Sequence, residues 1–202
     1  MIKIGDKYFM PNLLLKPLVA LPVILFIWLI ILINKKKHQK AIVSLILDIP
    51  FMLYIYLLLG QTIFPIAVFL NGKLPNIISK YGIGRQYFIQ LNPMAIFKYS
   101  MTYYGFINIV GNVILLVPLV IFISFYWPQL NNFKSAVQIA FFGSLTIELI
   151  QLVMNLFYIS NRLFDVDDLI LNTLGGIIAF FILKIFKRIF PNIFNVLSTE
   201  GA

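Results

Sequence analysis

Cysteine is absent from this chain of 202 residues, and charged residues are scarce. Without cysteine the chain can form no disulfide, no thiolate metal site and no cysteine nucleophile. Only 11% of the residues are charged and 61% are hydrophobic, whereas a soluble domain is about 25% charged and about 45–50% apolar. The composition therefore excludes an ordinary soluble domain and predicts an integral membrane protein.

Histidine and the common catalytic motifs are also scarce. The one histidine, His38, lies within the basic run Lys35–Lys40, which favours a solvated side chain over a catalytic one. The chain has no phosphate-binding loop, no H-E-x-x-H motif and no G-x-S-x-G motif. The net charge is +9, but the basic residues stand at the ends of apolar runs and no nucleic-acid-binding module accompanies them. We therefore expect no cofactor and no nucleic-acid partner.

Apolar runs of about 20 residues predict an all-α polytopic membrane protein with about five transmembrane helices. The expected spans are residues 17–33, 41–59, 106–127, 135–158 and 166–186. Lysines precede the first span as in a signal peptide, but no small-residue cleavage site follows it, so we interpret it as an uncleaved anchor. Between the second and third spans, residues 71–105 mix basic residues with tyrosines, which favours an interfacial or re-entrant segment. These tyrosines are Tyr81, Tyr87, Tyr99, Tyr103 and Tyr104.

We divide the chain into an N-terminal anchor with a basic loop (1–40), a four-span core (41–190) and a short C-terminal tail (191–202). Basic residues in short loops favour the cytoplasmic side of a membrane. Each side would hold eight of them, but four lie within residues 34–40, against four across the whole of 71–105. This density predicts an N-terminus outside and a C-terminus in the cytoplasm.

Polar side chains in the last three spans recur at helical spacing, so that each set shares one helix face. The sets are Asn108 with Asn112; Glu148 with Gln151 and Asn155; and Asp165 with Asp168 and Asn172. If the outer end of each span lies at the outer membrane boundary, Asn112, Gln151 and Asn172 lie roughly 9–11 Å below that boundary. Glu148 lies about 15 Å below it, near the midplane. Polar groups are costly in lipid, so we predict an outward-opening polar cleft with the Glu148 carboxyl at its floor.

Structural roles compete with functional ones at these positions. Amides in spans also join helices by hydrogen bonds. Asp165, Asp167 and Asp168 suit a helix start as well as a divalent cation, and we predict no metal site. Arg162, the nearest basic residue, is expected at the outer end of the fifth span, above the reach of Glu148. Close approach of helices is expected at the small residues Gly111, Gly175–Gly176 and Ala179, and a kink in the third span is expected at Pro118.

These residues carry a family resemblance. The pattern consists of Asn108-x-x-Gly111-Asn112-x-x-Leu115-x-x-Pro118, Glu148-x-x-Gln151 and Arg162-x-x-Asp165-x-Asp167-Asp168-x-x-x-Asn172-x-x-Gly175. It resembles the VanZ-like family over roughly residues 45–185, with weaker similarity at Thr62–Pro65 and Leu91–Pro93. The chain departs from the family beside Pro118, where Leu116 replaces a usual phenylalanine and Val120 a usual glycine. The resemblance implies a bacterial plasma-membrane protein associated with low-level resistance to teicoplanin-type glycopeptide antibiotics.

Several functions are compatible with this pattern. The leading hypothesis is a cleft that binds the headgroup of an envelope lipid or a cell-wall precursor, or the glycopeptide antibiotic, with Arg162 and Lys98 near a phosphate. The second is an intramembrane enzyme with Glu148 or Asp168 as general base. A small transporter that protonates Glu148 lacks support from any internal repeat, and a structural subunit of unknown oligomeric state stays open. The ligand-binding candidates are Asn108, Asn112, Gln151, Arg162, Asp165 and Asn172.

Overall fold

The computed structural model describes residues 2–4, 7–36, 41–84, 89–93, 95 and 102–200. Several residues named or counted above lie outside the described residues. They are Lys37, His38, Lys40, Arg85, Tyr87, Lys98 and Tyr99.

Helices dominate the described chain, and short strands join them at one end. The first two fifths of the chain consist of β1 (Ile2–Ile4), β2 (Lys7–Phe9), β3 (Leu13–Leu15), η1 (Pro17–Ala20), α1 (Leu21–Lys36), α2 (Ala41–Thr62), β4 (Ile66–Val68) and α3 (Lys73–Tyr81). The remainder consists of β5 (Ile89–Gln90), α4 (Tyr103–Leu115), α5 (Val117–Tyr126), η3 (Pro128–Leu130), α6 (Phe133–Leu156), β6 (Phe164–Asp165), α7 (Val166–Ile189) and α8 (Pro191–Glu200).

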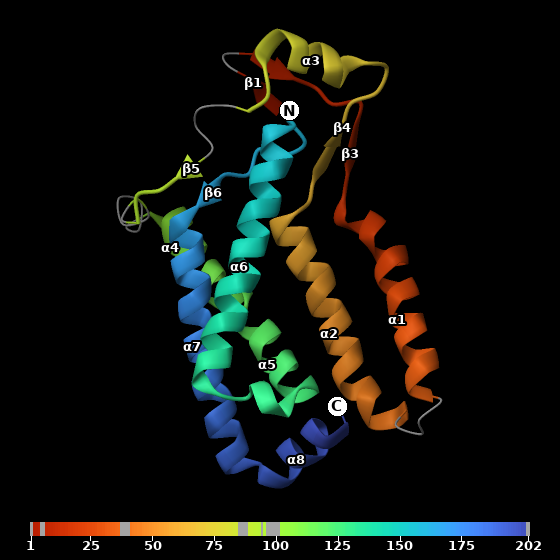
Figure 1. Cartoon of the computed structure of the whole chain (residues 1–202), viewed down its shortest axis with the longest axis vertical. Helices are drawn as coiled ribbons and strands as arrows, with labels where there is room; N and C mark the ends of the chain where they lie inside the picture. The colour runs from red at the N-terminus through yellow and green to blue at the C-terminus, as the bar shows by residue number, and fades with distance from the viewer. Residues whose placement is uncertain are drawn as a thin grey trace.

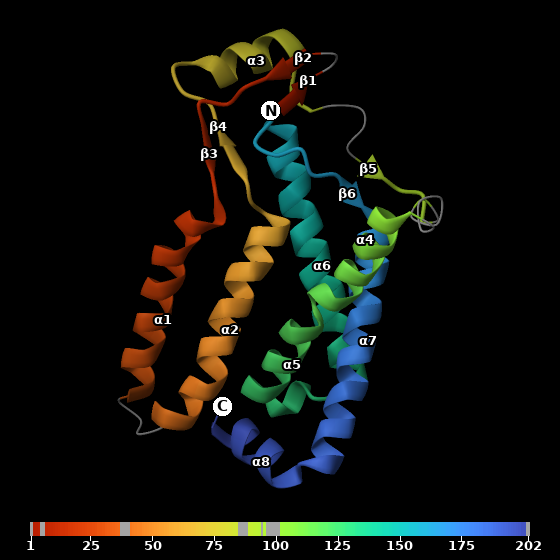
Figure 2. The same cartoon turned by 180° about the vertical axis from the view of Figure 1, so that it is seen from behind.

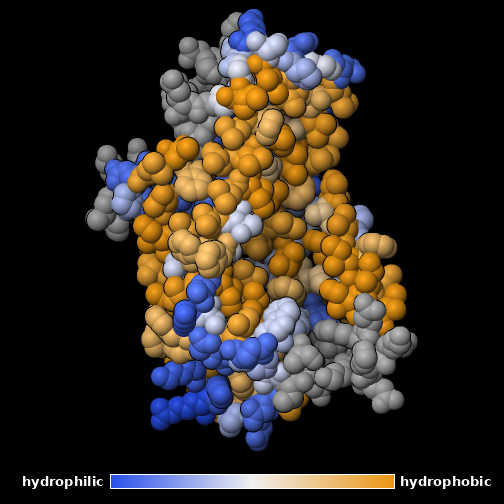
Figure 3. All heavy atoms as spheres, viewed as in Figure 1, coloured by the Kyte–Doolittle hydropathy of each residue, from blue (hydrophilic) through white to orange (hydrophobic). Residues whose placement is uncertain are grey.

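Four helical segments in the described part are long and apolar enough to cross a membrane. They are Leu45–Thr62, Tyr103–Tyr126, Phe133–Leu156 and Val166–Ile189. The first of the five expected spans, Pro17–Ile33, forms an apolar helix of 17 residues, shorter than these four segments. Figure 3 shows hydrophobic side chains over the middle of the molecule, with hydrophilic ones gathered toward both ends. The chain is thus a mostly helical membrane protein, as the composition predicts.

The strands, which were not expected from the sequence, pair at one end of the helices (Figures 1 and 2). β1 pairs with β2 and β3 with β4, both antiparallel, whereas β5 and β6 are parallel. We call β1–β4 and α3 the cap, and the end of the molecule that they cover the cap end. The opposite end carries η3 and α8 (Figure 1), and we call it the α8 end.

The apolar face of α3 packs against the protein itself. Ile77 of α3 is buried with Ile2, Ala67 and Tyr158, and Leu74, Ile78 and Tyr81 pack against the same cluster. The expectation of an interfacial or re-entrant segment rested on this mixture of apolar and basic residues. Because the cap uses the apolar face of α3 for its own core, this helix has little apolar surface left to insert into lipid.

The expected third span is divided into α4 and α5 at Leu116, whose φ of −100° and ψ of 0° interrupt the helix. Pro118 lies at the start of α5, where its missing N–H removes no helical hydrogen bond. The Tyr54 hydroxyl donates to the Leu115 carbonyl at 3.0 Å, which satisfies one acceptor at the end of α4. The kink expected at Pro118 is therefore a complete break, stabilised from α2.

Small residues bring α7 against α6 and α4. A Cβ added to Gly176 would lie 2.4 Å from the Ala140 Cβ, and one added to Gly175 would lie 2.1 Å from the Val113 carbonyl oxygen. Ala136, Ala140 and Ala179 are also buried here. Gly111 differs from the expectation, because an added Cβ there would meet no atom within 4 Å. Gly175 and Gly176 serve close packing, and Gly111 does not.

Candidate functional site

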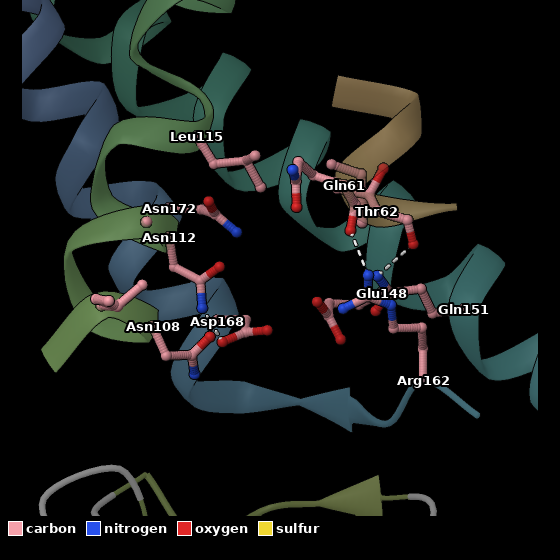
Figure 4. A pocket seen from close by; sticks show the side chains of 13 residues that line it. Gln61, Thr62, Asn108, Asn112, Leu115, Glu148, Gln151, Arg162, Asp168 and Asn172 are labelled. Carbon is pink, nitrogen blue, oxygen red and sulfur yellow. Dashed lines mark hydrogen bonds between the residues drawn. The ribbon is translucent and has the colours of Figure 1, made fainter. Parts of the chain in front are cut away.

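A polar cavity of about 260 Å³ lies between α2, α4, α6 and α7 near the cap end (Figure 4). Its polar lining comes from four helices and from the loop that precedes α7. These polar residues are Gln61, Thr62, Asn108, Asn112, Glu148, Gln151, Arg162, Asp168 and Asn172. Seven of the eight candidate residues therefore line one cavity, and Asp165 is the exception.

Two hydrogen bonds between α6 and the start of α7 fix the far wall of the cavity. Glu148 Oε2 accepts from the backbone N–H of Asp165 at 2.8 Å, and Asn172 Nδ2 donates to Ser144 Oγ at 2.9 Å. Glu148 and Asn172 are both almost completely buried, and Asn172 Oδ1 accepts no hydrogen bond. The glycine and alanine contacts one turn further along hold the two helices at this register.

The expected depths of these residues are wrong. Glu148 lies beside Asp165, immediately before α7, and is therefore closer to the cap end than Asn172, which bonds to Ser144 one turn away on α6. Seven residues of α6 separate Gln151 from Ser144, the partner of Asn172, so the two amides differ in level by about 10 Å. The error arose because α6 continues past the start of α7 (Figure 1). Its last turn leads to Tyr158, which is buried in the cap, and the chain then returns to begin α7.

Arg162 reaches the cavity, contrary to the expectation that it lies out of reach of Glu148. Its Nη2 donates to the Gln61 carbonyl at 2.6 Å, and Figure 4 shows the guanidinium group extending toward Glu148. Asn155 does not line the cavity. Its Nδ2 donates to the Arg162 carbonyl, and it thereby holds the loop that presents the arginine. After α6 the chain turns back along this helix before α7 begins, and this turn brings the Arg162 side chain to the level of Glu148.

The face of α4 forms the opposite wall. Asn112 Nδ2 donates to Asp168 Oδ1, which joins α4 to α7, and Asn108 lies one turn earlier beside them (Figure 4). Gly111 also lines the cavity, and its missing side chain leaves space there. The i, i+4 spacing of Asn108 and Asn112 thus produces a single polar strip on α4, as predicted from the sequence.

Asp165 is a helix cap and does not contact the cavity. Its Oδ1 accepts from the backbone N–H of Asp167 at 2.9 Å, a typical N-cap interaction at the start of α7. Burial raises the pKa of its carboxyl above the usual range, while the hydrogen bond from Asp167 opposes this effect. Within the described residues, no group of three acidic, histidine or cysteine side chains could hold a metal ion. The structure gives Asp165 a capping role at the start of α7, and its assignment to ligand binding stays a prediction.

The wall that α2 contributes was not predicted from the sequence. Gln151 Nε2 donates to the Thr62 carbonyl at 2.8 Å, and the Gln61 carbonyl accepts from Arg162. Both acceptors lie at the C-terminal end of α2, where helical carbonyls lack intrahelical partners. The only signal in the sequence for this wall was the pair of polar residues, Gln61 and Thr62, at the end of an apolar span. Backbone carbonyl groups, however, leave no pattern in a sequence.

The lining combines two carboxyl groups, one guanidinium group and several amides. The carboxylates and carbonyl groups accept hydrogen bonds, whereas the amide nitrogens and Arg162 donate them. Such a set can bind a small polar or charged group that carries both donors and acceptors. Two carboxyl groups in one cavity can also exchange protons with a substrate.

Comparisons with known proteins identify the family. A search of curated proteins gave no match, and a search of solved structures gave none. The VanZ/LLP1 family model matches residues 51–187. This range includes α4–α6, all but the last two residues of α7 and the C-terminal half of α2, and hence every residue that lines the cavity. The match confirms the resemblance seen in the sequence, and the chain belongs to the VanZ/LLP1 family.

Proposed function

We propose that this protein acts in the bacterial plasma membrane, where its cavity binds the headgroup of an envelope lipid or cell-wall precursor. The position of the cavity relative to Tyr103 and Tyr104 carries this proposal. These two tyrosines begin α4 and are 75% and 84% exposed. Exposed tyrosines at the end of a span favour the membrane–water interface, at the level of the lipid headgroups. Asn108 and Asn112 lie about 6 Å and 12 Å further along α4 than Tyr104. The polar strip of Asn108 and Asn112 therefore begins just below the level of the lipid headgroups, within reach of a headgroup that enters the cavity.

The size and chemistry of the lining support a headgroup over a whole glycopeptide antibiotic. The cavity volume of about 260 Å³ is below the roughly 300–1,000 Å³ of sites for drug-sized ligands. Arg162 suits a phosphate group, and the amides of Asn108 and Asn112 suit hydroxyl or amide groups. A role in glycopeptide tolerance would then follow from a change in the availability of the bound lipid or precursor.

The proposal requires the cap end to face outward, and cysteine labelling tests this orientation. The chain lacks cysteine, so a maleimide can label only the cysteine that is introduced. Lys80→Cys places this cysteine in the cap, and Gln129→Cys places it at the α8 end. Both positions are exposed. In intact cells a membrane-impermeant maleimide should label Lys80→Cys and spare Gln129→Cys, with both labelled after lysis. The reverse pattern would turn the cavity toward the cytoplasm and reject the envelope proposal.

Binding can be tested by the lipids that remain with the purified protein. Native mass spectrometry of the wild type in mild detergent should show a retained lipid, and Arg162→Gln should reduce it. Thr146→Val is the matched control, because Thr146 is exposed on α6 and its hydroxyl bonds only the Phe142 carbonyl. Equal retention in the two variants would reject the cavity as the binding site. Teicoplanin tolerance of the same strains connects binding to phenotype.

An intramembrane enzyme is the second candidate, and one observation favours it: Glu148 and Asp168 line the same cavity from two helices. Either carboxyl group could act as general base on a lipid-linked substrate. Lipid and cell-wall extracts of cells with and without the protein distinguish the two functions. A new modified species that disappears in Asp168→Asn supports the enzyme. Unchanged chemistry with altered antibiotic tolerance supports binding alone.

A further inference from the structure

The charges in the cavity point to a more specific ligand. We propose that the bound headgroup carries a primary ammonium group beside a phosphate, as phosphoethanolamine does, with the ammonium between Glu148 and Asp168 and the phosphate at Arg162. This inference rests on the proposed function, because it specifies the headgroup that the cavity selects. The two carboxylates and their remaining acceptor oxygens support the ammonium, and the arginine supports the phosphate.

Two carboxyl groups in one intramembrane cavity need a counter-charge, a proton or water. The only strongly basic group among the described lining residues is the Arg162 guanidinium. Figure 4 shows the Glu148 and Asp168 side chains extending from different helices toward the space between them. A cation placed there is attracted by both carboxylates, and its own loss of hydration is offset by their hydrogen bonds.

Acceptors remain in this space after the protein's own hydrogen bonds are made. Glu148 uses Oε2 for the Asp165 N–H, and Asp168 uses Oδ1 for Asn112, so each carboxylate keeps a second oxygen. A primary ammonium has three N–H donors. Two of these donors can meet the two remaining carboxylate oxygens, whereas a quaternary ammonium has no N–H to donate.

Arg162 supplies the complementary charge at the edge of the cavity. A guanidinium group has five N–H donors, and one nitrogen, Nη2, is bound to the Gln61 carbonyl. This bond fixes the side chain and leaves donors for a phosphate, which guanidinium groups bind in a charge-assisted manner. An ammonium and a phosphate in one small headgroup would thus meet opposite charges at separate parts of the lining.

The test compares lipids that differ in these groups alone. Wild-type protein in mild detergent is incubated with equimolar phosphatidylethanolamine, phosphatidylcholine, phosphatidylglycerol and phosphatidic acid of the same acyl chains, and native mass spectrometry measures retention. We expect phosphatidylethanolamine to be retained about tenfold over phosphatidylcholine, since hydrogen bonds to charged groups are the stronger ones. Glu148→Gln and Asp168→Asn should reduce this preference, whereas Arg162→Gln should reduce the retention of both lipids to the same extent. Thr146→Val should behave as wild type.

The outcomes separate this inference from the proposed function. Equal retention of phosphatidylethanolamine and phosphatidylcholine, both lost in Arg162→Gln, overturns the ammonium and leaves headgroup binding intact. A preference for phosphatidylglycerol overturns it in favour of hydroxyl donors. Retention of all lipids independent of the cavity variants overturns both proposals. The comparison of the four lipids uses only the wild-type protein. It therefore tests the preference for the ammonium headgroup even where a variant fails to fold.

A second arm identifies the source of the ligand. Free O-phosphoethanolamine is added to the wild-type complex with phosphatidylethanolamine. Displacement of the lipid supports recognition of the headgroup alone, which a soluble metabolite could also satisfy. Retained lipid supports the same chemistry with a membrane source, because the acyl chains then contribute to binding beside α2 and α4.

Discussion

The helix pair α6–α7 packs differently at its two ends. Toward the α8 end, Gly176 meets Ala136 and Ala140 so closely that a methyl group would not fit. Toward the cap end, the same two helices are joined by polar side chains and border a cavity. The change takes place within one turn of α7, between Asn172 and Gly175. One half of the pair therefore supplies rigidity, and the other half supplies a site whose polar groups contribute less to stability.

The sharpest test of this comparison is Gly176→Ala. Its Cβ would lie 2.4 Å from the Ala140 Cβ and 2.9 Å from the Ala136 carbonyl oxygen, both on α6, and because backbone cannot move aside cheaply we expect a destabilisation of at least the about 1–3 kcal/mol typical of overpacking. The variant should lose monodisperse protein in fluorescence-detected gel filtration. Gly111→Ala is the control, since its Cβ meets nothing within 4 Å. Equal behaviour of the two variants would show that the packed end is not tightly packed.

The next effect concerns Glu148 at the polar end. Glu148→Leu leaves the Asp165 N–H without its partner and should lower stability by about 1–3 kcal/mol. Glu148→Gln keeps an acceptor oxygen, so its melting in detergent should stay near wild type, while the preference for phosphatidylethanolamine is reduced and antibiotic tolerance is lost. Full function in Glu148→Gln would reject the general-base, transport and ammonium-binding roles of its carboxyl.

A smaller effect is expected where the two ends meet. Asn172 and Ser144 bond to each other in a buried position, and replacing both partners by apolar groups is often close to neutral. The double variant Asn172→Leu/Ser144→Ala should therefore melt within about 1 kcal/mol of wild type but lose the retained lipid. A large loss of stability would show instead that the polar end also holds the helices together.

The smallest expected effect is a pH dependence at Asp165. Burial raises the pKa of its carboxyl in the folded protein, so its contribution to stability is largest below the usual aspartate pKa of about 3.9. That contribution decreases as pH rises through the interval up to the raised pKa. Asp165→Asn keeps an oxygen for the Asp167 N–H and cannot ionise. The melting temperature of the wild type relative to this variant should therefore fall as pH rises. Parallel curves of melting temperature against pH would contradict a raised pKa of the Asp165 carboxyl.

Local patterns in the sequence predicted much of the helical core. The bounds of α6 and α7 differ by only a few residues from the expected spans, because long apolar runs with flanking polar residues are strong signals. Helical spacing also placed Asn108 beside Asn112 on one face of α4. These features depend on neighbours within one helix, which is why they can be predicted from a single sequence.

Features that depend on contacts between distant segments were missed. The level of Glu148 depends on how far α6 extends past α7, and the role of the α2 terminus depends on carbonyl groups that no residue type reveals. The break at Leu116 depends on a hydroxyl from Tyr54, 61 residues away from Leu115 along the chain. Asp48 lies within the second expected span and was given no role, yet it is buried and accepts from Tyr126 at 2.7 Å.

The cap has a consequence for the order in which the protein can be built during synthesis. Ile2 is buried against Ala67, Ile77 and Tyr158, so a residue that is synthesised before all of α1 to α6 has its final neighbours among residues that are synthesised much later. Chains are synthesised from the N-terminus, and contacts so distant in sequence form slowly. The N-terminal strand must therefore wait until α6 has been inserted. We infer that completion of the cap is a late event, one that reports on whether the whole bundle has assembled.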